Sequence, residues 1–345
     1  MAELTLGARG TEQSIAVDIN ARGQMVGIIE EDDGRQRAIL YDKRPIELGT
    51  LGGSDGFTRD INANGDVVGT AQNAAGHWRA FVFRHGDRMR DLGTLGGHGS
   101  YGAAINDRGE VVGFADTSDG YYRAFLSDGE RAPRDLGTLG GKISYAAGIN
   151  NLGDVVGTAA LPDGYRRAFL YKAGGAMQDI GTLGGRSSSA SAINDKGVVV
   201  GASETVGRRW HAFVWEQGKM TDLGALIGYG DSFATAVNEA GHVAGSIRVG
   251  DERRSFVYRD GKMTVHPGGY GLYLVNAINN QELVIGAKYA GKKFSASTMI
   301  SSQPAVVTHG GQDLLTMIAA VLIATAGVVV YRRRYRGLRL FSLAF

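Results

Sequence analysis

The stretch INDRGEVVG at residues 105–113 returns along the chain at a nearly constant spacing. The pattern Ile-Asn-x-x-Gly-x-Val-Val-Gly also begins at positions 61, 149 and 193, and looser copies begin at 19, 237 and 278. Its asparagine stands at positions 20, 62, 106, 150, 194, 238 and 279, which makes seven copies of about 44 residues. A fixed period of this length is the signature of a repeat architecture.

Two further phrases keep the same period. Arg-Ala-Phe occurs at 79–81, 123–125 and 167–169, and His-Ala-Phe occurs at 211–213. Asp-Leu-Gly-Thr-Leu-Gly-Gly occurs at 91–97 and 135–141, with near copies at 47–53, 179–185 and 222–228. Each unit therefore predicts four short strands, with a tight Asn-x-x-Gly turn after the first and the Val-Val-Gly run as the second. The Arg-Ala-Phe phrase is the third strand, and the fourth runs into Asp-Leu-Gly-Thr-Leu.

Four antiparallel strands in about 44 residues make a propeller blade, so we expect an all-β, seven-bladed propeller over residues 1–300. Residues 3–6 match a fourth strand, whereas the seventh unit supplies only three strands, at about 272–300. We expect the segment Leu4–Leu6 to pair with the strand near Ala296–Ile300. That pairing would complete the last blade and close the ring without an exposed sheet edge.

The phrases His211-Ala212-Phe213 (with its Arg-Ala-Phe relatives), DLGTLGG and INxxGxVVG together resemble the HAF-repeat family of extracellular bacterial proteins. The resemblance covers about residues 3–300. It implies a secreted or surface setting and no established activity or catalytic residues. Most copies here begin with Arg, so we expect no shared chemical role for the histidine.

The C-terminal part of the chain predicts a membrane anchor. Residues 314–331 carry no charge and are long enough to cross a hydrocarbon core of about 30 Å. Five arginines follow within residues 332–345, so the positive-inside rule predicts a basic cytoplasmic tail there, and residues 301–313 form a linker to an external propeller. The alternative is a buried core helix. The segment resembles bacterial C-terminal sorting signals but lacks a Pro-Glu-Pro motif, which leaves processing of the tail open.

The start of the chain conflicts with export, because no basic or apolar signal segment follows Met1. We expect that the true start lies upstream. The alternative is a tail-anchored protein whose propeller faces the cytoplasm.

Composition excludes several classes of function. The chain has no cysteine, which removes disulfides, thiolate zinc sites and cysteine nucleophiles. Residues 1–331 hold 32 basic and 35 acidic side chains, so the propeller lacks the basic surface that nucleic acid binding needs. Glycine is abundant, at 54 of 345 residues, as expected for a chain with many turns.

The sequence predicts no catalytic residue, cofactor or metal site. Its seven histidines lack metal-ligand spacing, and the repeated GTLGG phrase leads into strands, so we interpret it as structural rather than as a nucleotide loop. Asp60–Asp66 imitates the start of a calcium loop without the downstream glutamate; a hairpin turn is favoured, and calcium remains the alternative. The recurring acids of strand four are expected to form cross-strand pairs with the bases of strand three; these are Glu47, Asp91, Asp135, Asp179 and Asp222, with Arg79, Arg123 and Arg167.

Aromatic residues mark the candidate binding surface. The loop between strands two and three carries one set, which we predict as ligand-binding: Trp78, Tyr121, Tyr122, Tyr165 and Trp210. The connection between blades carries a second set on the same face: Phe57, Tyr101, Tyr145 and Phe233. Such aromatics form a platform for sugar rings or a protein partner, or else pack between blades.

These observations favour a monomeric, non-enzymatic binding module displayed on the cell surface that recognises glycan or an extracellular protein. A polysaccharide hydrolase or lyase is the first alternative. A structural surface spacer is the second.

Overall fold

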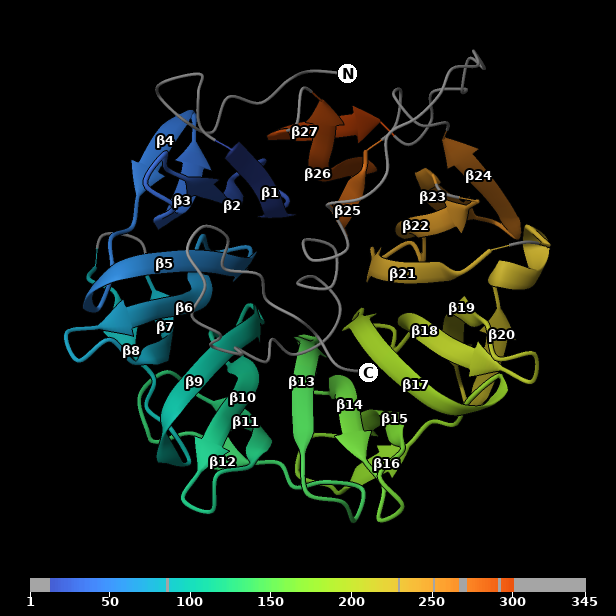
Figure 1. Cartoon of the computed structure of the whole chain (residues 1–345), viewed down its shortest axis with the longest axis horizontal. Coiled ribbons are helices and arrows are strands. Elements are labelled where there is room, and N and C mark those ends of the chain that lie inside the picture. Colours follow the sequence, from blue (N-terminus) through green and yellow to red (C-terminus); the bar gives the residue numbers. More distant parts are fainter. Residues whose placement is uncertain are drawn as a thin grey trace.

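The computed structural model describes residues 13–84, 87–228, 230–250, 252–266, 272–290 and 293–300. Within them the chain forms seven antiparallel sheets arranged as blades around a central axis (Figure 1). Each blade is a meander in which strands one to four pair in chain order, and the seventh blade has three described strands. The predicted seven-bladed propeller is therefore confirmed.

Strand one of each blade ends at the Ile-Asn or Val-Asn pair of the repeat. These strands are β1 (Gln13–Ile19), β5 (Gly52–Ile61), β9 (Gly96–Ile105), β13 (Ser144–Ile149), β17 (Gly184–Ile193), β21 (Ser232–Val237) and β25 (Leu274–Ile278). Strand two contains the Val-Val-Gly run or its variant. These strands are β2 (Met25–Glu30), β6 (Val67–Asn73), β10 (Val111–Thr117), β14 (Val155–Ala160), β18 (Val199–Thr205), β22 (Val243–Val249) and β26 (Leu283–Ala290).

Strand three contains the Arg-Ala-Phe phrase or the segment equivalent to it. These strands are β3 (Gln36–Asp42), β7 (Trp78–Phe83), β11 (Tyr122–Ser127), β15 (Arg166–Tyr171), β19 (Trp210–Glu216), β23 (Glu252–Arg259) and β27 (Lys293–Ile300). Strand four completes six of the blades. These strands are β4 (Arg44–Glu47), β8 (Arg90–Asp91), β12 (Arg134–Asp135), β16 (Met177–Asp179), β20 (Lys219–Asp222) and β24 (Lys262–His266). A short 3₁₀ helix, η1 (Gly224–Leu226), joins blades 5 and 6.

The fourth strand is shorter than predicted, because most of the Asp-Leu-Gly-Thr-Leu-Gly-Gly phrase forms a turn. In blade 2, β8 ends at Asp91, and Gly93 and Gly96 then take φ values of 87° and 106°. The Thr94 hydroxyl donates to the Gly97 carbonyl at 2.9 Å and so fixes the turn. Strand β9 begins inside the phrase, at Gly96. The phrase is thus a structural connector between blades, as predicted.

The hydrophobic core lies between blades as well as within them. The phenylalanine of the Arg-Ala-Phe phrase is fully buried in five blades, at positions 81, 125, 169, 213 and 256. Both valines of the Val-Val-Gly run are fully buried in blades 2 to 5. Adjacent side chains of one strand point to opposite sheet faces, so burial of both valines means that each blade is covered on both faces.

The ring closes between blade 7 and blade 1, whose strands lie side by side in Figure 1. The Ala296 amide donates to the Ser14 hydroxyl at 3.1 Å, and the Asn276 side-chain amide donates to the Ala16 carbonyl at 2.7 Å. A shared core cluster includes Ala16 and Ile19 from blade 1 and Ile285 from blade 7. The predicted closed ring is therefore confirmed for the part of the chain that the structure describes.

Several predictions fall outside the described residues. They are the N-terminal strand at residues 3–6, the linker at 301–313, the membrane segment at 314–331 and the basic tail at 332–345. Among the described residues, no helix has the length and apolar character needed to span a membrane.

Candidate ligand-binding face

The meander gives the ring two different faces. Strands alternate in direction, so the loops between strands two and three emerge on the same face as the connections between blades. We call this the aromatic face, because it carries both aromatic sets. The opposite face carries the Asn-x-x-Gly turns between strands one and two, and we call it the asparagine face.

The two aromatic sets meet on the aromatic face. The Tyr122 ring lies 6.2 Å from the Tyr101 ring and 6.0 Å from the Tyr145 ring, measured between centroids. Phe114 on β10 stacks on Tyr101 at 4.8 Å and meets Tyr145 edge-on at 5.0 Å. Trp78 packs against the same group, and we call these five side chains the aromatic cluster. It joins blades 2, 3 and 4.

The second set mainly packs between blades, which was one of the two predicted alternatives. Phe57, Tyr101 and Tyr145 are buried on strand one, and Phe233 is half-buried. Trp78 contacts Phe57 with ring centroids 5.5 Å apart. The buried second set therefore supports the half-buried Trp78 and Tyr122 of the first set from below.

Burial governs the ionisation of the aromatic cluster. Burial raises the pKa of the Tyr101, Tyr122 and Tyr145 hydroxyls above their usual value, so all three stay protonated at neutral pH. Burial also raises the pKa of Asp116, which accepts a hydrogen bond from the Gly99 amide at 3.0 Å. The cluster thus offers neutral hydroxyl groups beside apolar rings.

Two predicted tyrosines lie at the loop tips and hold basic side chains. The Lys142 ammonium donates to the Tyr121 hydroxyl at 2.8 Å and lies 4.9 Å from the ring centroid. The Arg186 guanidinium donates to the Tyr165 hydroxyl and lies 5.1 Å from that ring. In both pairs the base comes from the start of the next blade. Tyr165 is 36% exposed.

Four of the five predicted residues therefore gather over blades 2 to 4. The fifth, Trp210, begins β19 in blade 5 and is half-buried there, with its main-chain amide donating to Asp231 at 3.0 Å. The bases that contact the tyrosines were missed from the sequence. A spacing of 21 residues between tyrosine and base, found twice, is the signal that marks them.

Two of the three predicted cross-strand arginine–aspartate pairs form on this face, whereas the Arg123 Nε has no hydrogen-bond partner among the described residues. Arg79 Nε lies 3.1 Å from Asp91, Arg167 Nε lies 3.4 Å from Asp179, and His211 Nδ1 lies 2.9 Å from Asp222. His211 thus occupies the position of the arginines and makes the same contact. These acids also accept main-chain hydrogen bonds from the turns that follow, for example Asp179 from the Gly181 amide at 2.8 Å. Their role is structural.

The Asp60–Asp66 stretch forms the favoured hairpin turn. The Gly65 amide donates to the Asn62 carbonyl at 3.0 Å, and the Asn62 side chain accepts the amide of Asp66 at 2.9 Å. Asp60 instead joins blades, because it accepts the Ile105 amide at 2.8 Å. Burial, and then the neighbouring Asp18 carboxylate, raise the pKa of Asp60 well above its usual range. Within the described ranges, no three His, Asp or Glu side chains are grouped to hold a metal.

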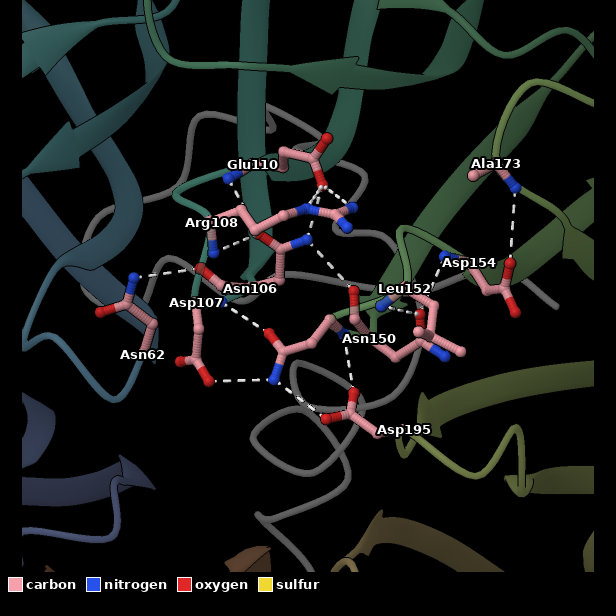
Figure 2. Close-up of polar contacts among 11 residues, drawn as sticks. Asn62, Asn106, Asp107, Arg108, Glu110, Asn150, Leu152, Asp154, Ala173 and Asp195 are labelled. Carbon is pink, nitrogen blue, oxygen red and sulfur yellow. Dashed lines mark hydrogen bonds and ion pairs between the residues drawn. The ribbon is translucent and has the colours of Figure 1, made fainter.

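The asparagine face holds a network that the sequence did not reveal. In every blade the asparagine Oδ1 accepts two main-chain amides of its own turn, from the second and fourth residues after it. At six consecutive junctions its Nδ2 also donates to the main-chain carbonyl of the next asparagine, at 2.9–3.2 Å. Figure 2 shows three successive members, Asn62, Asn106 and Asn150. The asparagine therefore closes its turn and ties its blade to the next.

The residue after each asparagine adds a second link. The Asp107 amide donates to Asn151 Oδ1 at 2.8 Å, and the Asn151 amide donates to Asp195 Oδ1 at 2.7 Å. The Asn151 side-chain amide donates to both aspartates, at 2.9 Å to Asp107 and 3.0 Å to Asp195. These acids are engaged by neighbouring turns, so the network is structural and the aromatic face remains the candidate site.

Comparisons with known proteins agree with the fold. No protein-family model matches the chain, and no curated protein matches it. A puromycin-hydrolysing peptidase from Mycobacterium tuberculosis is similar, with a TM-score of 0.60 and 14% identity over 92% of this chain and 55% of that one. The chain thus spans about half of that peptidase.

Two other solved structures are similar over most of both chains. The β-propeller domain of the Trilobed protease from Pyrococcus furiosus gives a TM-score of 0.60 at 10% identity, covering 83% of this chain and 95% of that one. The BP39L lectin from Burkholderia pseudomallei gives 0.51 at 10% identity, covering 84% and 96%. Likeness at such low identity concerns the fold alone, and by fold the chain is a β-propeller.

Proposed function

We propose that the protein is a non-enzymatic binding module that recognises carbohydrate on its aromatic face. The observation that carries this proposal is that blades 2 to 4 carry Trp78 and Tyr122 in the aromatic cluster and Tyr121 and Tyr165 at the loop tips, with ammonium and guanidinium groups at the hydroxyls of the latter two. Sugar rings present apolar C–H faces and polar hydroxyl edges. A surface that combines aromatic faces with fixed hydrogen-bonding groups complements both.

The fold is compatible with this role, because a lectin shares it. Hydrolysis has less support. This chain spans only about half of the peptidase that shares its fold, and the recurring acids of strand four are engaged in ion pairs and turns. An extracellular protein partner is the alternative occupant of the same face.

The proposal is tested by screening the full-length protein on a glycan array and measuring the hits by calorimetry. Trp78→Ala and Tyr122→Ala are expected to weaken binding at least about tenfold, as buried aromatic anchors do in interfaces. Leu152→Ala is the matched control, because Leu152 is 59% exposed on the asparagine face. Thermal melting checks that each variant folds. An array without hits, or hits that all three variants bind equally, would contradict the proposal.

We further propose that the aromatic face is displayed outside the cell by a C-terminal anchor at residues 314–331, in a repeat protein of HAF type. The support is the repeated HAF-like phrase together with the uncharged segment and the five arginines that follow it. The test is protease treatment of intact cells that carry one epitope in the loop at Asp119 and another at the C-terminus. Loss of the Asp119 epitope alone is expected. Protection of both until lysis would refute external display.

A further inference from the structure

On the aromatic face, side chains from the same two positions meet at three consecutive blade junctions. The first member comes from the loop between strands two and three, and the second comes from the start of the next blade. The pairs are His77 with His98, Tyr121 with Lys142, and Tyr165 with Arg186. The two histidine rings stack with centroids 5.2 Å apart. The first members stand 44 residues apart, so the pairs occupy equivalent positions on blades 2, 3 and 4.

The chemistry of the two tyrosine pairs suits a sugar unit. Each base is fixed beside its ring by a hydrogen bond to the phenolic oxygen, so a ring and several N–H donors lie next to each other. Nearby acids accept main-chain hydrogen bonds: Asp163 accepts the Tyr165 amide at 3.1 Å, and Glu204 accepts the Arg186 amide at 2.8 Å. Lys142 and Arg186 are exposed and can reach hydroxyl or carboxylate oxygens of a ligand.

The pairs form an arc with two ends. At the junction of blades 1 and 2 the equivalent positions hold Arg35 and Ser54, and Arg35 is engaged by Asp33 at 2.6 Å. At the junction of blades 5 and 6 the first position holds Arg209. Neither of these first positions holds an aromatic or imidazole ring. Three adjacent contact points with an end on each side fit an extended chain better than a single terminal sugar.

We propose that the three pairs are subsites for one linear polysaccharide chain, which crosses the three junctions from blade 2 to blade 5 and contacts each pair in turn. This inference rests on the proposed carbohydrate-binding function and specifies its ligand class. Contacts linked through one chain act at high effective concentration, so affinity rises with chain length until all subsites are filled.

The test uses β-1,4-linked oligosaccharides of glucose, N-acetylglucosamine and galacturonic acid, each one to six units long, with the full-length protein. At least one series is expected to gain about tenfold or more in affinity between one unit and six. Tyr121→Ala and Tyr165→Ala should each weaken hexasaccharide binding about tenfold and leave monosaccharide binding nearly unchanged. Tyr121→Phe and Tyr165→Phe keep the ring and should retain most of the affinity.

Arg209→Ala is the matched control, because it alters the equivalent loop position at the junction of blades 5 and 6, outside the three proposed pairs. Binding that is independent of length, or hexasaccharide binding that both Tyr→Ala variants leave intact, overturns the inference while carbohydrate binding stands. The inference is also overturned if none of the three oligosaccharide series binds while the array shows binding to other glycans. An array without any hit overturns the proposed function and this inference together.

Discussion

At the scale of single residues, one side chain often serves two neighbours. The repeat asparagine closes its own turn through Oδ1 and joins the next blade through Nδ2, as at Asn150. The sequence predicts the turn, because Asn-x-x-Gly is a local signal. It does not predict the second bond, whose acceptor is a main-chain carbonyl 44 residues away. The sequence reflects this contact only in that all seven repeats have asparagine at this position.

His266 is a residue whose effect on stability should depend on pH. It is buried at the position where other blades have a core leucine, such as Leu92 or Leu223. Its Nε2 has no hydrogen-bond partner among the described residues, and burial lowers its pKa from 6.5. Below pH 6.5 the unfolded chain therefore binds a proton that the folded chain resists, and stability falls as the pH falls.

We expect His266→Leu to raise the free energy of unfolding by about 1–3 kcal/mol, because it removes a buried unsatisfied nitrogen. The wild-type protein should lose stability between pH 6.5 and 5 relative to this variant. Denaturant unfolding across that range measures the difference. His77→Gln, at a surface histidine, controls for the loss of one histidine and should keep the decline. A gap between His266→Leu and wild type that is the same at every pH would show that protonation of His266 plays no part.

At the scale of the strand, the glycine of Val-Val-Gly is fixed by packing on both sides. A Cβ at Gly157 would overlap the Tyr145 carbonyl of strand one and would lie 3.0 Å from the Phe169 ring of strand three. Strand one bulges at this level, between Ala146 and Gly148. The sequence shows the glycine in every clear copy, yet β propensity alone disfavours it there. Close contact between strands explains its presence.

We expect Gly157→Ala to lower the free energy of unfolding by about 1–3 kcal/mol, because the added methyl group overpacks the blade. Thermal and denaturant unfolding measure the loss. Gly207→Ala is the matched control: its Cβ would meet only the Thr205 hydroxyl, at 3.8 Å, and its φ is not positive. Equal stability of the two variants would mean that blade 4 relaxes around the methyl group.

At the scale of the molecule, the fold followed from the sequence and the site followed only in part. Period and strand pattern predict the ring, since local signals recur seven times. The aromatic residues were visible, but their roles depend on which loops meet. Tyr121 and Tyr122 are adjacent in sequence, yet one holds Lys142 at a loop tip and the other packs on Tyr101 and Tyr145. Contacts between blades decide this, and no local pattern encodes them.

Closure of the ring can be tested by comparing equivalent junctions. Ser100 accepts the Ala80 amide at 2.9 Å between blades 2 and 3, and Ser14 accepts the Ala296 amide at 3.1 Å between blades 1 and 7. Each serine satisfies a buried amide, so Ser100→Ala and Ser14→Ala should each cost about 1–3 kcal/mol. In a closed ring both should lower the same single unfolding transition, because the junction of blades 1 and 7 carries the same packing as the others. Differential scanning calorimetry and fluorescence-monitored unfolding together measure the number of transitions and their midpoints. If the junction were open, Ser14→Ala would leave the unfolding transition unchanged or would shift only an early partial transition. Ser100→Ala would in either case shift the main transition.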